Sequence, residues 1–197
     1  MKSWRIYPGQ TIGLLGGSFD PPHEGHAHIT RQALKQFGLD AVWWLVSPGN
    51  PLKKHWPAPL QERIRVARKV MSHPQVFISD LEERLGTRYT AQTLSAVQLT
   101  YPATRFVWLM GSDNLAQFHL WHNWRVIMHT LPIGVLARPG YGSSARLSRV
   151  ARSYRYAAVK SSDRRLLARM TAPAWTFVNI PLSSSSSSEL RYAGKVT

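Results

Sequence analysis

The chain contains no cysteine among its 197 residues. Without thiols it can form neither a disulfide nor a thiolate metal site, and a cysteine nucleophile is excluded. Acidic residues are scarce as well: 10 Asp and Glu stand against 25 Lys and Arg, which gives a formal net charge of +15. An excess of this size suits an anionic partner, which could be a nucleic acid, an anionic membrane surface or a small molecule that carries phosphates.

Long apolar runs are also missing. No run of about eighteen apolar residues occurs, and Met1 is followed by polar, turn-like residues instead of an apolar signal core. We therefore expect a cytoplasmic protein without a membrane span. Hydrophobic residues still make up 44% of the chain, which is enough for one sizeable core. We expect a single domain over residues 1–197, with a basic helical arm at about 142–171.

Short β-like runs alternate with helical patterns along the chain. One apolar helical stripe lies within residues 60–71, and a second one, from Ile29 to Phe37, ends at Gly38, a residue typical of helix ends. Strands that alternate with helices predict an α/β fold, a Rossmann-like doubly wound parallel sheet with helices on both faces. The β-like runs cover residues 11–15, 41–47, 76–79, 105–110, 132–137 and 175–180.

The most informative segment is residues 16–26, Gly-Gly-Ser-Phe-Asp-Pro-Pro-His-Glu-Gly-His, which follows the first β-like run. Glycines at the end of a strand let the backbone approach a ligand, and a helix that begins there directs its N–H groups and dipole at an anion. His23 and His26 lie on one face of the first helical turn, where both imidazoles can donate to phosphate oxygens. The segment therefore predicts a phosphate site.

Residues 16–26 could instead form a plain turn or a zinc site. Gly-Gly and Pro-Pro are ordinary turn residues, but turn chemistry does not require so many special residues in one strand-to-helix junction. Two histidines at this spacing could also bind zinc, yet the sequence offers no obvious third and fourth ligand. We therefore predict no metal site made by protein ligands.

Much of the positive charge lies between residues 146 and 169, where only Asp163 opposes it. Spacings of three and four would place these basic side chains in stripes on the helical arm. We favour a solvated face over a nucleic-acid surface, and a contact between copies of the chain in a homo-oligomer stays open. The basic residues are Arg146, Arg149, Arg152, Arg155, Lys160, Arg164, Arg165 and Arg169.

Six consecutive serines, residues 183–188, precede Glu189, Leu190 and Arg191. A serine run near a chain end is typical of a flexible tail. The same residues could instead begin a helix, because serine is a good N-cap, and Arg191 would then share a face with Ser187. In that case the segment would form a second anion site.

With these segments in place, the sequence resembles the nucleotidyltransferase superfamily and, within it, the bacterial nicotinate-nucleotide adenylyltransferases. The resemblance spans nearly the whole chain, and residues 16–26 are similar to the family signature GGSFDPxHxGH. Ser185 departs from the pattern, since the family usually has an apolar residue there, and Ser188 replaces a threonine. The other similar segments are residues 47–53, 89–94 (YTxxTL), 111–114 (GxD), 138–140 and 186–191 (SSTxxR).

The resemblance implies transfer of the adenylyl group of ATP to nicotinate mononucleotide in NAD biosynthesis, with Mg²⁺ bound through the ATP phosphates. His23 and His26 would be the catalytic residues. Expected ATP-binding residues are Gly16, Gly17, Ser18, Phe19, His23, His26, Gly111, Asp113, Ser187 and Arg191. Expected acceptor-binding residues are Ser18, Phe19, Lys53, Thr90, Trp121 and Arg138.

Two alternatives to this function stay open. Within the superfamily, the acceptor could be nicotinamide mononucleotide or pantetheine phosphate, although Thr90 and Trp121 favour a pyridine nucleotide. From a different class, the basic segment at 146–169 suggests a nucleic-acid-binding module, whose affinity would fall steeply with salt. We regard nucleic acid as the weaker partner prediction and the two small-molecule substrates as the stronger one.

Overall fold

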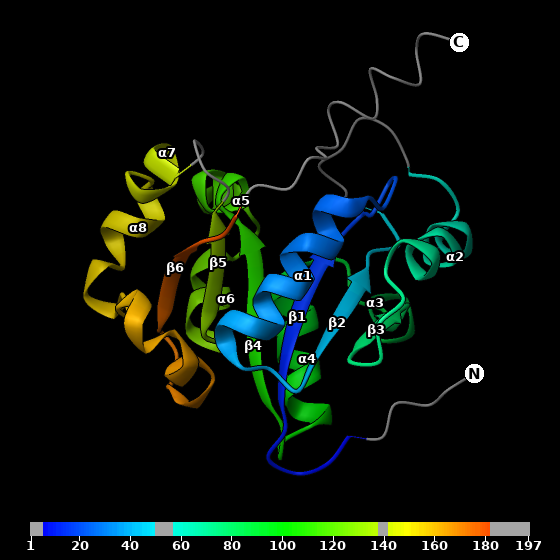
Figure 1. Ribbon diagram of the computed structural model, residues 1–197, viewed down its shortest axis with the longest axis horizontal. Helices are drawn as coiled ribbons and strands as arrows, with labels where there is room; N and C mark the ends of the chain where they lie inside the picture. Colours follow the sequence, from blue (N-terminus) through cyan, green and yellow to red (C-terminus); the bar gives the residue numbers. More distant parts are fainter. Residues whose placement is uncertain (1–5, 50–56, 138–141, 182–197) are drawn as a thin grey trace, which may run out of the picture.

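The computed structural model describes residues 6–49, 57–137 and 142–181. Its centre is a six-stranded parallel sheet in the order β3-β2-β1-β4-β5-β6, covered by helices on both faces (Figure 1). The strand order reverses between β1 and β4, which is the doubly wound arrangement that the sequence predicts. The strands are β1 (Thr11–Gly17), β2 (Ala41–Val46), β3 (Val76–Ser79), β4 (Arg105–Gly111), β5 (Ile133–Ala137) and β6 (Trp175–Asn179).

Each strand supplies side chains to two separate cores, because successive residues of a strand point to opposite faces of the sheet. In β2, Trp43 belongs to the core under α4 (Thr90–Thr100) and α6 (Trp124–Thr130). Trp44 belongs to the core under α1 (Glu24–Phe37) and α2 (Leu60–Val70). Both indoles are almost fully buried. The near-continuous apolar strands are those of a parallel sheet that is covered on both sides.

One face of the sheet is covered by α1 (Glu24–Phe37), α2 (Leu60–Val70) and the 3-10 helix η3 (Ser161–Arg169). The predicted stripe of α1 is confirmed, since Ile29, Ala33 and Phe37 are buried and the helix ends at Gly38 in the left-handed conformation. The stripe of α2 is confirmed by the burial of Ile64 and Ala67.

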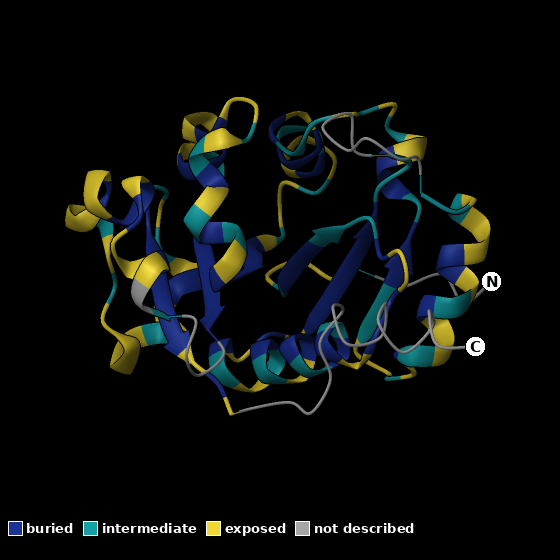
Figure 2. Cartoon of the chain, turned by 90° about the horizontal axis from the view of Figure 1, so that it is seen from above, coloured by how far each residue is buried: buried dark blue, intermediate teal, exposed yellow. Residues whose placement is uncertain are grey.

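The other face is covered by α3 (Leu81–Arg84), α4 (Thr90–Thr100), α5 (Ser112–Gln117), the 3-10 helix η1 (Phe118–Leu120), α6 (Trp124–Thr130) and two helices of the basic segment. Figure 2 shows the buried strands between the two helical layers, whose outer surfaces are exposed. Among the described residues, we find no helix that could serve as a membrane span.

The basic segment folds as several short helices beside β6 (Figure 1): α7 (Gly142–Arg146), α8 (Arg149–Ser153), the 3-10 helix η2 (Arg155–Ala157) and η3. Ser148 caps α8 by accepting a hydrogen bond from the Ala151 amide, so α7 and α8 are separate helices. Val150 and Leu167 anchor the segment in the two cores, while most of its arginine side chains are exposed.

Candidate active site

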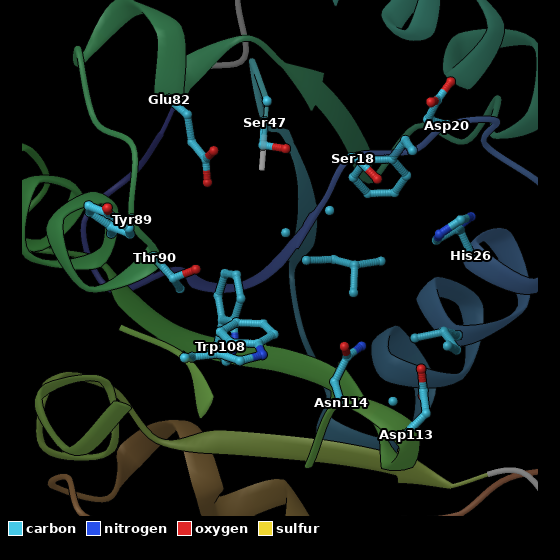
Figure 3. Close-up of a pocket in the computed structure, with 18 of the residues that line it drawn as sticks. Ser18, Asp20, His26, Ser47, Glu82, Tyr89, Thr90, Trp108, Asp113 and Asn114 are labelled. Atoms are coloured by element: carbon cyan, nitrogen blue, oxygen red, sulfur yellow. The ribbon is translucent and has the colours of Figure 1, made fainter. Parts of the chain in front are cut away.

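A cleft of about 380 Å³ opens at the carboxyl ends of β1, β2 and β4, beside the point where the strand order reverses. Two walls face each other across it (Figure 3). We call residues 16–26 together with Asp113 the histidine wall, and Glu82, Tyr89, Thr90, Trp121 and His122 the aromatic wall. All ten predicted site residues that lie within the described parts of the chain line this cleft: Gly16, Gly17, Ser18, Phe19, His23, His26, Thr90, Gly111, Asp113 and Trp121.

The histidine wall begins with a turn that aromatic packing holds in place. A Cβ atom on Gly16 would collide with the Trp108 ring, so glycine is required for this ring to lie against the end of β1. Phe19 adopts a φ of 46°, in the left-handed region that non-glycine residues rarely occupy. Its buried ring stacks on Trp44, with 4.7 Å between ring centroids. This packing favours the unusual backbone conformation, which places Ser18 at the cleft.

His23 and His26 form a reciprocal cap at the start of α1. Nδ1 of His23 accepts from the Gly25 amide at 3.0 Å, and Nδ1 of His26 accepts from the His23 amide at 3.3 Å. When neutral, both rings therefore carry their hydrogen on Nε2. The ring centroids lie 3.9 Å apart, and His26 extends into the cleft (Figure 3). The cap thus fixes the tautomer of two neighbouring N–H donors beside a helix N-terminus.

Arg63 of α2, which the sequence alone does not mark as a site residue, ties together the loops that follow β1 and β2. Its guanidinium donates to the carbonyl oxygens of Ser18, at 2.5 Å, Ser47, at 2.8 Å, and Pro48, at 3.1 Å. Only 2% of the residue is exposed. Burial lowers the pKa of Arg63, and the carboxylate of Asp20 acts in the opposite direction. Arg63 therefore holds the histidine wall against the rest of the sheet edge.

Asp113 stands on the same side of the cleft as His26 (Figure 3). It belongs to the first turn of α5, whose N-cap is Gly111, the last residue of β4. A Cβ atom on Gly111 would collide with Oδ1 of Asp113, so the glycine makes room for this carboxylate. Asp113 thereby presents an exposed hydrogen-bond acceptor at the cleft.

The aromatic wall is built around the N-terminus of α4, where Thr90 is the first helical residue and Tyr89 the N-cap. The Tyr89 ring stacks on His122 with 4.2 Å between centroids, which joins this helix start to the segment after η1. Trp121 lies next to His122 and packs edge-on against Phe118 at 5.2 Å. The half-buried Trp121 thus adds an aromatic surface to a helix N-terminus.

Glu82 is a second residue that sequence reasoning missed. It lies in α3, directly after β3, and is 6% exposed, yet its carboxylate points into the cleft (Figure 3). Burial raises the pKa of Glu82 to about 7, and a hydrogen bond with the Thr93 side chain acts in the opposite direction. Its position at the carboxyl end of a parallel strand is the signal that could have identified it.

Four predicted site residues lie outside the described parts of the chain. These are Lys53, Arg138, Ser187 and Arg191, and their roles stay predictions. The serine run at 183–188 lies outside as well. Within the described residues, no group of three or more His, Cys, Asp or Glu side chains could hold a metal ion.

Comparison with known proteins assigns the chain to a family. A model of the cytidylyltransferase-like family matches residues 14–191. The chain is also 59% identical over 187 residues to a probable nicotinate-nucleotide adenylyltransferase of Ruegeria pomeroyi, an alignment that covers 95% of this chain and 88% of the relative. The chain belongs to the nicotinate-nucleotide adenylyltransferase family. A relative of the same name in Parvibaculum lavamentivorans is 50% identical, with 96% of this chain and 94% of the relative covered.

Solved structures that resemble this adenylyltransferase family member agree with the fold. Nicotinic acid mononucleotide adenylyltransferase of Plasmodium falciparum, complexed with NaAD, superposes with a TM-score of 0.69 at 18% sequence identity, covering 93% of this chain and 83% of that one. The same enzyme complexed with APC gives a TM-score of 0.66. At this level of identity the likeness establishes the shared fold.

Proposed function

We propose that this protein transfers the adenylyl group of ATP to nicotinate mononucleotide, which gives nicotinate adenine dinucleotide and pyrophosphate in NAD biosynthesis. The observation that carries the proposal is the meeting of two complementary walls in one cleft. The histidine wall offers donors suited to phosphates, and the aromatic wall offers a flat surface and a helix N-terminus suited to an aromatic acid.

The chemistry needs no general base, because a phosphate dianion is already a nucleophile at neutral pH. An oxygen of the acceptor 5′-phosphate forms a bond to the α-phosphorus of ATP. The bond from that phosphorus to the oxygen that bridges to the β-phosphate breaks, and pyrophosphate leaves with the electron pair. Catalysis then consists of positioning the two substrates and of stabilising the charge that builds up on the phosphate oxygens.

His23 and His26 would supply that stabilisation. Both rings carry an Nε2 hydrogen in the tautomer that the α1 cap selects, so both can donate to phosphate oxygens. The dipole and the N–H groups at the start of α1 favour negative charge at the same place. We expect His26, which extends into the cleft, to act on the α-phosphate.

The remaining contacts can be assigned by chemistry. Asp113 would accept hydrogen bonds from the ribose hydroxyls of ATP, and Gly16, Gly17 and Ser18 would let the phosphates approach the backbone at the end of β1. Thr90 would face the nicotinate carboxylate, and Trp121 would stack on the pyridine ring. Lys53, Arg138, Ser187 and Arg191 keep their predicted roles as further phosphate or substrate ligands.

Mg²⁺ would arrive with ATP, held mainly by the phosphates and by water. The donor chemistry of the cleft fits this arrangement, since Asp20 adds one carboxylate at its rim and Mg²⁺ typically takes one or two carboxylates besides phosphates. When bound, the ion neutralises charge on the triphosphate. We also propose a cytoplasmic location, as the composition predicts.

The acceptor is tested by measuring pyrophosphate release from ATP with nicotinate mononucleotide, nicotinamide mononucleotide and pantetheine phosphate in parallel reactions. The proposal predicts the highest kcat/KM with nicotinate mononucleotide. Preferential turnover of pantetheine phosphate would instead support the alternative acceptor class and would leave the aromatic wall without its assigned role.

A further inference from the structure

The aromatic wall contains a charge that the mechanism above does not use. Glu82 is a buried carboxylic acid that lines the same part of the cleft as Tyr89 and Thr90 (Figure 3). Within residues 6–49, 57–137 and 142–181, no ion pair reaches its carboxylate. A buried and unpaired negative charge acts strongly on any charged group that enters the cleft beside it, because the local dielectric is low.

Hydrogen bonds hold Glu82 in this position. Its side chain bonds to Thr93 of α4, and its backbone carbonyl accepts from the Thr87 amide at 3.0 Å. Thr87 and Thr93 are joined by a hydroxyl contact of 2.8 Å, and the Thr93 hydroxyl oxygen also lies 3.3 Å from the Tyr89 carbonyl oxygen. The network links α3 to the first turn of α4, so the carboxylate keeps a fixed relation to Thr90.

The substituent on the acceptor ring is expected at this place. If Thr90 and the start of α4 receive the ring substituent, as the proposed function requires, Glu82 lies close to it. Nicotinate mononucleotide presents a carboxylate there, whereas nicotinamide mononucleotide presents a neutral carboxamide that can donate a hydrogen bond. The two acceptors are otherwise alike, and both rings carry the same positive nitrogen. An ionised glutamate therefore repels the carboxylate of nicotinate mononucleotide. It can accept a hydrogen bond from the carboxamide of nicotinamide mononucleotide.

We propose that Glu82 is a specificity-determining residue for the acceptor, and that its negative charge lowers the preference for the ring acid over the ring amide. The inference rests on the proposed function. Protonation of Glu82 removes the repulsion, so the preference for the acid is expected to fall as pH rises through the titration of this group. Its pKa of about 7 puts that change in the neutral range.

Other charged groups lie near Glu82 and have to be separated from it. On the described part of the chain, Asp80, Glu83 and Arg84 lie on α3 or its cap but do not line the cleft. Besides Glu82 and Tyr89, the titratable and charged groups that line it are Asp20, His23, His26, Arg88, Asp113 and His122. The acceptor phosphate titrates near pH 6, but it is identical in both nucleotides and cancels from their ratio. Comparing the ratio between wild type and a variant of Glu82 isolates the contribution of this residue.

The test measures kcat/KM for both mononucleotides from about pH 6 to pH 8. In the wild type, the acid-to-amide ratio should fall as pH rises. Glu82→Gln should raise the acid-to-amide ratio about tenfold at the upper pH and make the ratio independent of pH. This is the size of effect expected when a nearby charge is removed whose interaction with the ring substituent is partly screened. Glu82→Asp keeps the charge and should keep the pH dependence. Glu83→Gln, a change of the exposed neighbouring glutamate, should leave the ratio as in the wild type.

The outcomes separate the inference from the proposed function. A wild type that does not release pyrophosphate with nicotinate mononucleotide would overturn the function and this inference with it. An active wild type whose ratio and pH profile are unchanged in Glu82→Gln would overturn the inference alone. A lower acid-to-amide ratio in Glu82→Gln would also overturn the inference. Glu82 would then favour the acid, as it would if it were protonated and donated a hydrogen bond to the ring carboxylate. If Glu82→Gln does not fold, Glu82→Asp provides the test. An acid-to-amide ratio that still falls as pH rises supports the inference, and a ratio that no longer depends on pH overturns it.

Discussion

The histidine wall consists of backbone turns, imidazoles and the start of a 14-residue helix, whereas the aromatic wall consists of rings, a threonine and a buried carboxylic acid. Apart from Asp113, the first wall is continuous in sequence, because the residues from Gly16 to His26 form one strand-to-helix junction. The second is assembled from α3, the start of α4 and the segment after η1. A wall made mainly from one junction suits the phosphates, which all substrates of the reaction share. In a wall made from several segments, single residues can differ without changing the others, so such a wall suits the recognition of one particular acceptor ring.

The histidine wall should control the chemical step, and the largest expected effect concerns His26. His26→Ala removes the donor that we propose for the α-phosphate and should lower kcat by about a thousandfold, the scale known for the loss of one transition-state donor. Steady-state pyrophosphate release would measure it. His28→Ala is the matched control, because His28 lies on the same helix but bonds to the Pro181 carbonyl outside the cleft. A near-normal kcat for His26→Ala would contradict the assignment.

The next effect concerns Arg63, whose hydrogen bonds hold the histidine wall in place. Arg63→Ala leaves the carbonyl oxygens of Ser18, Ser47 and Pro48 without their buried charged donor, and it should lower the free energy of unfolding by about 4 kcal/mol. Urea unfolding followed by tryptophan fluorescence would measure the loss. Arg65→Ala, two residues along α2 on its exposed face, should change the stability by less than about 0.5 kcal/mol.

The next prediction concerns Glu82 of the aromatic wall, which should make the free energy of unfolding depend on pH. Glu82 has a folded-state pKa raised from 4.5 to about 7, so between these values the folded protein binds more protons than the unfolded chain. Stability should therefore fall as pH rises through this window, by about 3 kcal/mol for this one group. Glu82→Gln should lack this component, which a comparison of urea midpoints at both ends of the window would show. Parallel profiles for variant and wild type would mean that Glu82 is ionised as readily in the folded protein as in the unfolded one.

The smallest expected effect separates acceptor binding from chemistry. Trp121→Ala removes the flat surface assigned to the pyridine ring and should raise KM for nicotinate mononucleotide about tenfold, while KM for ATP stays nearly unchanged. Trp121→Phe should recover part of the loss. Equal increases in both KM values would show that Trp121 supports the cleft as a whole and does not recognise the acceptor ring.

The two walls also differ in how far the sequence predicts them. The strands, α1 and the turn between β1 and α1 follow from local patterns, since the apolar periodicity of each element and the residues from Gly16 to His26 are each contained in a short stretch of the chain. Arg63 and Glu82 could not be predicted this way. Arg63 bonds to Ser18, which is 45 residues away, and Glu82 is defined by the packing of α3 on α4. Likewise, the basic arm consists of several short helices because Ser148 caps α8, a local contact that the spacing of arginines does not reveal.

Adenylyl transfer is tested most directly by following the α-phosphorus of ATP. With ATP labelled at that atom and nicotinate mononucleotide as acceptor, we expect all transferred label to appear in nicotinate adenine dinucleotide and unlabelled pyrophosphate to form in equal amount. Neither product should form without the acceptor. Release of labelled AMP, or of pyrophosphate without the acceptor, would mean that water is the nucleophile. The two walls would then not form one site for two substrates.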